Sequence, residues 1–158
     1  MRPRLAIRLV LAMVAVIVAG GCATTAGPPP DPALLTYAPD TGVDLSRMEE
    51  TSSGLYIEDI EEGVGKNAMR GDRIRIHFIS WLPDGTLVDS TLAGEAYHFE
   101  LGSDEVIRGW NQGVIGMKVG GRRRLVIRPG LAYGARGRSP RVPPNAVLVF
   151  EIQLIDAN

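Results

Sequence analysis

The chain has 158 residues, enough for one domain with a substantial core. Its formal charge of −1 becomes −4 over residues 22–158, once three N-terminal arginines are set aside, and this acidic balance argues against binding to nucleic acid or to an anionic membrane surface. The single cysteine excludes an internal disulfide, so the core alone must stabilise the fold.

The N-terminus has the organisation of a secretion signal. Arg2, Arg4 and Arg8 form a basic region, and Leu9–Ala19 is an uncharged apolar run that is too short to span a bilayer. The following letters AGGC end at Cys22 and resemble a bacterial lipoprotein signal, in which the cysteine is lipidated and becomes the new N-terminus. We therefore expect a signal peptide over residues 1–21 and a lipid on Cys22. The alternative is an ordinary signal peptide whose cysteine lies there by chance.

Residues 22–50 have the composition of a linker. The letters AGPPPDP favour extended polyproline geometry, and Tyr37 and Leu45 are isolated apolar positions. This pattern predicts a Pro-rich tether between the anchor and a folded domain over residues 51–158. The chain has no heptad stretch long enough to form a dimerising helix, which favours a monomer.

Several segments after residue 51 have the alternation and composition of strands. In residues 73–82 the apolar side chains recur at every second position, so that one face is apolar and the other carries most of the polar groups. Turn-forming residues separate this segment from its neighbours. The predicted strands are 54–60, 73–82, 96–101, 123–129 and 146–157. In the fourth of these, Arg123 shares a face with apolar residues and must extend its charged end toward solvent, whereas Arg122 and Arg124 point outward.

One segment has the period of a helix. Ser103 or Asp104 could cap it, and four apolar side chains then follow at spacings of four, four and three residues. These are Val106, Trp110, Val114 and Met117, and Gly120-Gly121 would end the helix. Gly109, beside Trp110, would allow another chain to pass close by. Antiparallel strands packed on one short helix make an α+β domain.

The sequence contains none of the common arrangements of catalytic residues. His77 and His98 lack a second ligand at metal-binding spacing, and Cys22 has no neighbouring base. The glycines of GWNQGVIG do not follow a strand, as a dinucleotide fingerprint requires. We expect no metal and no cofactor. What remains is a set of aromatic and aliphatic residues near turns, and taken alone these would be interpreted as core.

Longer motifs change that interpretation. The segments EVIRGWNQGVIGMKVGGRRRLVI, LAYGARG and VPPNAVLVFEIQLI resemble the FK506-binding-protein family of peptidyl-prolyl cis-trans isomerases, and IHFISWLPDGTLVDST resembles the early strand pair of that family. The resemblance covers residues 51–158. It implies an antiparallel half-barrel of five to six strands wrapped on one short helix, in agreement with the elements predicted above.

The resemblance also implies a site. Trp110 would form the floor of an apolar cleft between helix and sheet, Ile107 would present its backbone N–H to the substrate, and Tyr133 would offer its hydroxyl to a substrate carbonyl. Asp89 matches an acidic residue at the cleft edge. The implied substrate-binding positions are Phe78, Val88, Tyr97, Phe99, Val106, Trp110 and Phe150.

Rotation of an X–Pro amide suits such a cleft. The barrier is roughly 18–20 kcal/mol because resonance is lost on twisting. A dry pocket withholds the solvation that favours the planar, more dipolar form, and fixed hydrogen bonds stabilise the twisted form. Neither a nucleophile nor a metal is needed.

Four positions differ from the family pattern, namely Phe78, Val88, and Arg138 and Arg141, which stand where members more often carry a histidine and an aliphatic residue. Phe78 stands where many members have a tyrosine, and Val88 replaces a larger aromatic residue. Asp89 has no arginine in the 90–96 loop, so its carboxylate is either unpartnered or pairs with Arg138 or Arg141 from the loop after Tyr133.

Three functions are consistent with these features. The first is an isomerase that assists the folding of exported proteins, whose partners are proline-containing polypeptides and macrolides of the FK506 class. The second is a non-catalytic module, or chaperone, that binds proline segments, and the third is a lipoprotein that only docks a partner. The only contact with a membrane is expected through the lipid, and Ala23 favours the outer membrane, facing the periplasm.

Overall fold

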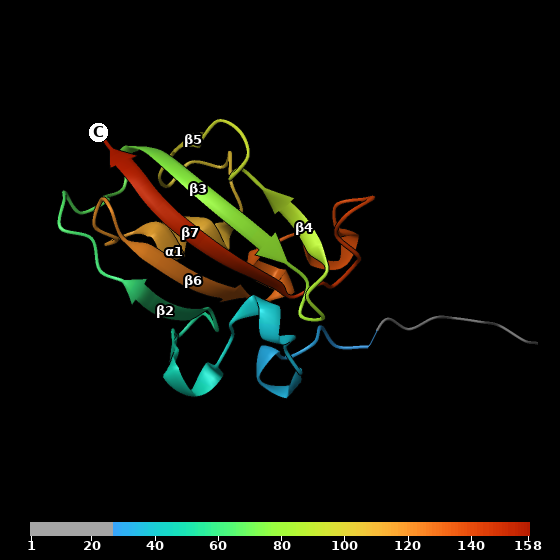
Figure 1. Cartoon of the computed structure of the whole chain (residues 1–158). Helices are drawn as coiled ribbons and strands as arrows, with labels where there is room; N and C mark the ends of the chain where they lie inside the picture. The colour runs from blue at the N-terminus through green and yellow to red at the C-terminus, as the bar shows by residue number, and fades with distance from the viewer. Residues whose placement is uncertain (1–26) are drawn as a thin grey trace, which may run out of the picture.

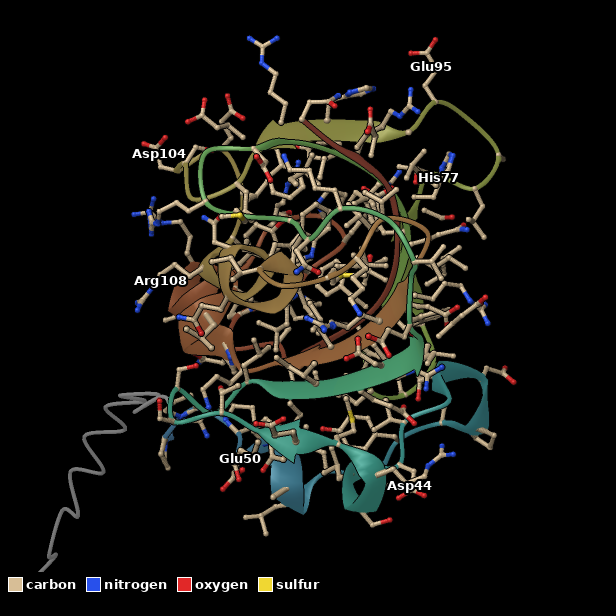
Figure 2. All side chains as sticks on the ribbon, turned by 90° about the vertical axis from the view of Figure 1, so that its left-hand side faces the viewer. Asp44, Glu50, His77, Glu95, Asp104 and Arg108 are labelled. Carbon is tan, nitrogen blue, oxygen red and sulfur yellow. The ribbon has the colours of Figure 1, made fainter. Side chains whose placement is uncertain are left out.

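The computed structural model describes residues 27–158, which form one open antiparallel sheet with a short helix on one face (Figure 1). The order of the strands is β1-β2-β6-β7-β3-β4, and β5 pairs with the other end of β3. The strands are β1 (Glu49–Glu50), β2 (Tyr56–Glu61), β3 (Arg73–Trp81), β4 (Leu87–Ser90), β5 (Tyr97–Glu100), β6 (Arg122–Ile127) and β7 (Leu148–Ala157). The predicted fold class is therefore confirmed, and each predicted strand is present with ends that differ by one or two residues. The sheet curves around the helix (Figure 2).

The inner face of the sheet carries the main core. Along β3 the buried side chains are Ile74, Ile76, Phe78 and Ser80, as the alternation predicted. The α-helix, α1 (Arg108–Val114), packs on this face. A Cβ at Gly109 would lie 2.5 Å from Cγ2 of Ile127, and one at Gly113 would lie 2.5 Å from Cδ1 of Leu125. The two glycines, four residues apart, therefore allow α1 to lie directly against β6.

The helix is shorter than the sequence predicted. It begins at Arg108, with Ile107 at the N-cap position and no side-chain cap, and neither Ser103 nor Asp104 caps it. The side chain of Asn111 explains the late start, because its Oδ1 accepts from the N–H of Gly102 (2.7 Å) and its Nδ2 donates to the carbonyl of Ser103 (2.6 Å). These bonds hold the preceding residues as a turn beside the helix. The helix also ends early, at Val114, and the N–H of Gly116 donates to the carbonyl of Ala68 (2.9 Å).

The outer face of the sheet is covered by the segment that was expected to be a tether. Residues 31–50 form three 3-10 helices, η1 (Pro32–Leu34), η2 (Pro39–Thr41) and η3 (Leu45–Arg47), followed by β1. The segment lies beside β2 on the outer side of the sheet (Figure 1), and its apolar side chains pack there against a second buried cluster. The cluster consists of Met48, Tyr56, Val126, Val147 and Val149, with Leu35, Tyr37, Val43, Leu45 and Trp81 packed against it. The domain thus extends N-terminally of residue 51.

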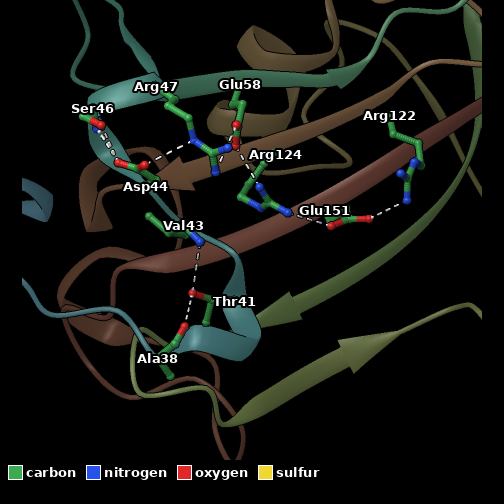
Figure 3. Close-up of polar contacts among 10 residues, drawn as sticks. All are labelled: Ala38, Thr41, Val43, Asp44, Ser46, Arg47, Glu58, Arg122, Arg124 and Glu151. Carbon is green, nitrogen blue, oxygen red and sulfur yellow. Dashed lines mark hydrogen bonds and ion pairs between the residues drawn. The ribbon is translucent and has the colours of Figure 1, made fainter.

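A group of ion pairs lies where this covering segment meets the sheet (Figure 3). Arg124 donates to Glu58 (2.7 Å) and to Glu151 (3.1 Å), and it bridges β2, β6 and β7. Arg47 of η3 also reaches Glu58, at 3.6 Å. A Cβ at Gly42 would lie 2.7 Å from Nη2 of Arg124, so the segment passes directly over this guanidinium. Arg124 thus points to the outer face as predicted, but it is largely covered there.

Arg123 lies on the opposite face of β6, as its parity predicted. Its guanidinium makes two hydrogen bonds to the carboxylate of Asp59, at 2.6 and 2.9 Å, and donates to the carbonyl of Gly113 at 2.9 Å. The arginine thereby joins the C-terminal end of α1 to the sheet. Within residues 27–158 no helix is long and apolar enough to cross a membrane.

Candidate active site

Five aromatic rings meet between α1 and the inner face of the sheet. Trp110, on the buried side of α1, contacts Phe78 of β3 at a centroid distance of 4.9 Å, Phe150 of β7 at 5.4 Å and Tyr97 of β5 at 5.7 Å, all edge-to-face. Phe99 lies at 5.7 Å in a tilted arrangement. Such geometries stabilise aromatic clusters beyond the area that they bury. The close approach that Gly109 permits places Trp110 at the base of this cluster.

A cavity of about 1180 Å³ opens above these rings. Nine of the ten predicted site residues in the described chain line it, namely Phe78, Val88, Asp89, Tyr97, Val106, Ile107, Trp110, Tyr133 and Phe150. Phe99 is the exception, because it is buried behind Tyr97 and Trp110 and supports them from the core. Cys22, the predicted lipidation site, lies outside the described residues.

Ile107 offers a backbone donor among the residues that line the cavity. Ile107 has extended backbone angles, and its carbonyl accepts from the N–H groups of Trp110 (3.0 Å) and Asn111 (3.3 Å), which starts the helix. Its own N–H has no acceptor among residues 27–158. Because Ile107 also lines the cavity, a bound carbonyl can satisfy this donor.

Tyr133 supplies a hydroxyl among the residues that line the cavity. It follows η4 (Pro129–Leu131) and precedes η5 (Gly134–Arg136), and its own carbonyl accepts from the N–H of Gly137 at 3.1 Å. Nη1 of Arg138 donates to the Tyr133 hydroxyl oxygen at 3.1 Å, and the guanidinium carbon lies 5.6 Å from the ring centroid. The hydroxyl proton remains available to a ligand.

Asp89 is not an unpartnered acid. Nη1 of Arg141 lies 3.3 Å from Oδ1 of Asp89 and 3.4 Å from the carbonyl of Val88, and the N–H of Ser90 donates to the same carboxylate oxygen at 2.9 Å. Of the two alternatives left open by the sequence, pairing with the loop after Tyr133 is the one that the structure supports. Both charged side chains remain about half exposed, so the pair closes the cavity rim and contributes little to stability.

Some lining residues were not assigned to the site from the sequence. Ser80, Val142 and Leu148 all line the cavity. Ser80 could have been found, because it shares the inner face of β3 with Phe78. Val142 and Leu148 could not be separated from ordinary core positions by their pattern.

The histidines have structural surroundings. Nδ1 of His77 lies 3.1 Å from the carbonyl and 3.2 Å from the hydroxyl of Thr91, on the side of β3 that faces away from Trp110. In the part of the chain that the structure describes, no group of three or more His, Cys, Asp or Glu side chains could hold a metal ion.

Comparison with known proteins agrees with this geometry. Residues 65–155 match the family model of the FKBP-type peptidyl-prolyl cis-trans isomerases. The FK506-binding protein of Neisseria meningitidis serogroup B is 45% identical over 103 residues, which cover 65% of this chain and 94% of that protein. FK506-binding protein 4 of Rhizopus delemar is 42% identical over 109 residues, and this chain spans only 28% of its length.

Solved structures also match this chain. The crystal structure of AtFKBP13 has a TM-score of 0.66 and 36% identity, and the match covers 70% of this chain and 98% of that one. FkpA from Escherichia coli has a TM-score of 0.66 and 37% identity, and the match covers 71% of this chain and 52% of that one. The motifs, the aromatic cavity and these matches together place the chain in the FKBP-type peptidyl-prolyl cis-trans isomerase family.

Proposed function

We propose that this protein catalyses cis-trans isomerisation of X–Pro bonds in polypeptides exported to the bacterial cell envelope. The observation that carries the proposal is the aromatic cavity, with an uncommitted N–H at Ile107 on one side and the Tyr133 hydroxyl on the other. Isomerisation takes tens to hundreds of seconds without catalysis and can limit folding, so exported chains are appropriate substrates.

The residues have separable roles in this reaction. The proline ring packs on Trp110 among Phe78, Tyr97 and Phe150, which exclude water from the amide. The Ile107 N–H and the Tyr133 hydroxyl then donate to carbonyl oxygens on either side of the proline and hold the chain while the bond rotates. A rate increase of about 10⁵-fold requires about 7 kcal/mol, which desolvation and positioning together can supply.

A direct assay tests the catalytic proposal. We expect the full chain to accelerate both the isomerisation of a short X–Pro peptide and the proline-limited refolding of a protein substrate. The Trp110→Ala variant should lose both effects. Binding of the peptide without any acceleration would contradict catalysis.

That contradicting result would favour a second function, a non-catalytic module or chaperone that binds proline segments. Phe78 and Val88 support this alternative, because the first lacks a hydroxyl and the second leaves a smaller wall than the family pattern. FK506-like macrolides are proposed ligands of the same cavity. Competition between a macrolide and a proline peptide would show that they share it.

The envelope location rests on the N-terminal sequence. The basic residues, the apolar run and AGGC support lipidation of Cys22 and attachment to a membrane, and Ala23 supports the outer membrane, facing the periplasm. The absence of a dimerising heptad supports a monomer. Mass spectrometry of the mature N-terminus should find a diacylglyceryl group on Cys22, and Cys22→Ser should release the protein from membranes. An unmodified Cys22 would contradict the anchor.

A further inference from the structure

The loop after Tyr133 has a defined conformation. In this loop, residues 134–142, which we call the flap, the N–H of Arg138 donates to the carbonyl of Val142 (2.8 Å), and the N–H of Val142 donates back (2.9 Å). Gly137 has φ +63°, and a Cβ there would lie 2.5 Å from the Val142 carbonyl oxygen, so this position requires glycine. The backbone of Arg138 is therefore fixed relative to Tyr133.

From this backbone the Arg138 side chain turns back over Tyr133. Its guanidinium both donates to the hydroxyl oxygen and lies above the ring, at the distances given above. Two contacts to one side chain define a geometry that a single exposed contact would not. The hydrogen bond to Tyr133 is also the main reason why the pKa of Arg138 lies above its usual value, with a smaller contribution from the nearby charge of Asp89.

The chemistry of the two groups decides which of them donates the hydrogen bond. A guanidinium can only donate, whereas a tyrosine hydroxyl donates once and accepts twice. When Arg138 occupies an acceptor position of the oxygen, the hydroxyl hydrogen must point elsewhere, and Tyr133 lines the cavity. Accepting a charge-assisted hydrogen bond also makes the hydroxyl a stronger donor.

We propose that Arg138 is a positioning residue that holds the Tyr133 hydroxyl as a donor toward the substrate carbonyl. This inference rests on the proposed isomerase function. Arg138 itself lines the cavity, but its role in this proposal is exerted through Tyr133.

A double-mutant cycle tests the inference in the full chain. The variants are Arg138→Gln, Tyr133→Phe and the two combined, assayed on one X–Pro peptide without charged side chains. We expect Arg138→Gln to lower kcat/KM about three- to ten-fold, the usual effect of one intramolecular hydrogen bond. In the Tyr133→Phe background the same change should have no further effect, because the hydroxyl is already absent.

Two controls separate positioning from a general effect of charge. Arg136→Gln removes another exposed arginine of the flap, one that has no hydrogen-bond or ion-pair partner within residues 27–158, and it should leave kcat/KM unchanged. Arg138→Lys keeps a positive donor and should restore part of the loss.

Three outcomes would overturn the inference. The first is an equal loss for Arg138→Gln in both backgrounds, the second is no loss at all, and the third is a loss seen only with peptides that carry an acidic residue, which would mean that Arg138 contacts the substrate itself. If the wild-type chain bound the peptide without turnover, the isomerase function would fail. The same cycle, measured on dissociation constants, would still decide whether Arg138 and Tyr133 act together.

Discussion

The two apolar faces of the sheet are covered in different ways. On the inner face, α1 is short and lies close to β6, and the space beside it is left as the aromatic cavity. On the outer face, residues 31–50 cover the apolar side chains, and the ion pair between Arg47 and Glu58 links this segment to β2. Stability can therefore be gained on the outer face without filling the aromatic cavity.

Each face contains one of the two tryptophans. Trp110 lies under the cavity on the inner face, and Trp81 is half-buried against the outer cluster. They give a matched pair of substitutions with which the separation of the two faces can be tested.

The largest effect is expected for Trp110→Ala. Removing this buried side chain should lower the free energy of unfolding by about 3–5 kcal/mol and abolish peptide binding. Trp81→Ala should cost less stability and leave peptide affinity unchanged. Denaturant unfolding and peptide titration, made on both variants below their unfolding transitions, check this. Equal losses of affinity would mean that the two faces are coupled.

A smaller effect is expected where α1 touches β6. The Cβ of Gly113→Ala would meet the fully buried Leu125, so overpacking should outweigh the better helix propensity of alanine, with a net destabilisation of about 1–2 kcal/mol. Gly130→Ala, at a position with open space around it, is the control and should be neutral. Thermal unfolding measures both. A stabilised Gly113→Ala variant would show that the helix has room to move away from β6.

The outer face should respond to alkaline pH. Tyr37 donates to the carbonyl of Pro32 at 2.9 Å, and burial, followed by the nearby Tyr56 and Asp31, raises its pKa well above the usual value of about 10. The unfolded chain releases this proton first, so the associated stability is present below pH 10 and is lost as the pH rises beyond it.

Tyr37→Phe should therefore cost about 0.5–1.5 kcal/mol at neutral pH and make the unfolding free energy less sensitive to pH above 10. Tyr56, whose pKa burial also raises, will keep part of that sensitivity. Unfolding curves at pH 7 and above pH 10 measure the difference. The same slope in both proteins would mean that the Tyr37 proton is not linked to folding.

The smallest effect is expected at the cavity rim. Asp89 and Arg141 form a half-exposed pair, so Asp89→Asn should change stability by less than about 1 kcal/mol. Phe78→Tyr would add a donor on the cavity-lining face and should raise turnover modestly. The wild type and both variants are compared on one peptide. Equal rates in all three would mean that the carboxylate makes no contribution to catalysis.

The sequence predicts the residues of the inner face well, because burial leaves a visible pattern there. The pattern is the strict alternation along residues 73–81 and the adjacent Gly109 and Trp110 in the helix. The outer covering could not be predicted in the same way. Residues 31–50 contain three single-turn 3-10 helices with isolated apolar side chains, so they have no period that a sequence pattern could reveal.

The sequence could name candidate long-range pairs but could not choose between them. Arg141 and Asp89 are 52 positions apart, and their contact depends on how the flap is folded against β4. The resemblance supplied candidate residues such as Tyr133, but the contact between Arg138 and its hydroxyl required coordinates. The sequence predicts too early a start for α1 because Asn111 binds the turn before it, an interaction that periodicity does not register.

The packed N-terminal segment also limits how far the folded domain can lie from the proposed lipid anchor. Because packing begins near Asp31, whose carboxylate accepts from the N–H of Ala33, only nine peptide units separate the proposed lipid at Cys22 from the folded body. At full extension they measure at most about 32 Å, close to the diameter of a small domain. A linker of this length would confine the enzyme to a thin layer at the bilayer surface. Its effective concentration would then be higher for polypeptides that emerge at that surface.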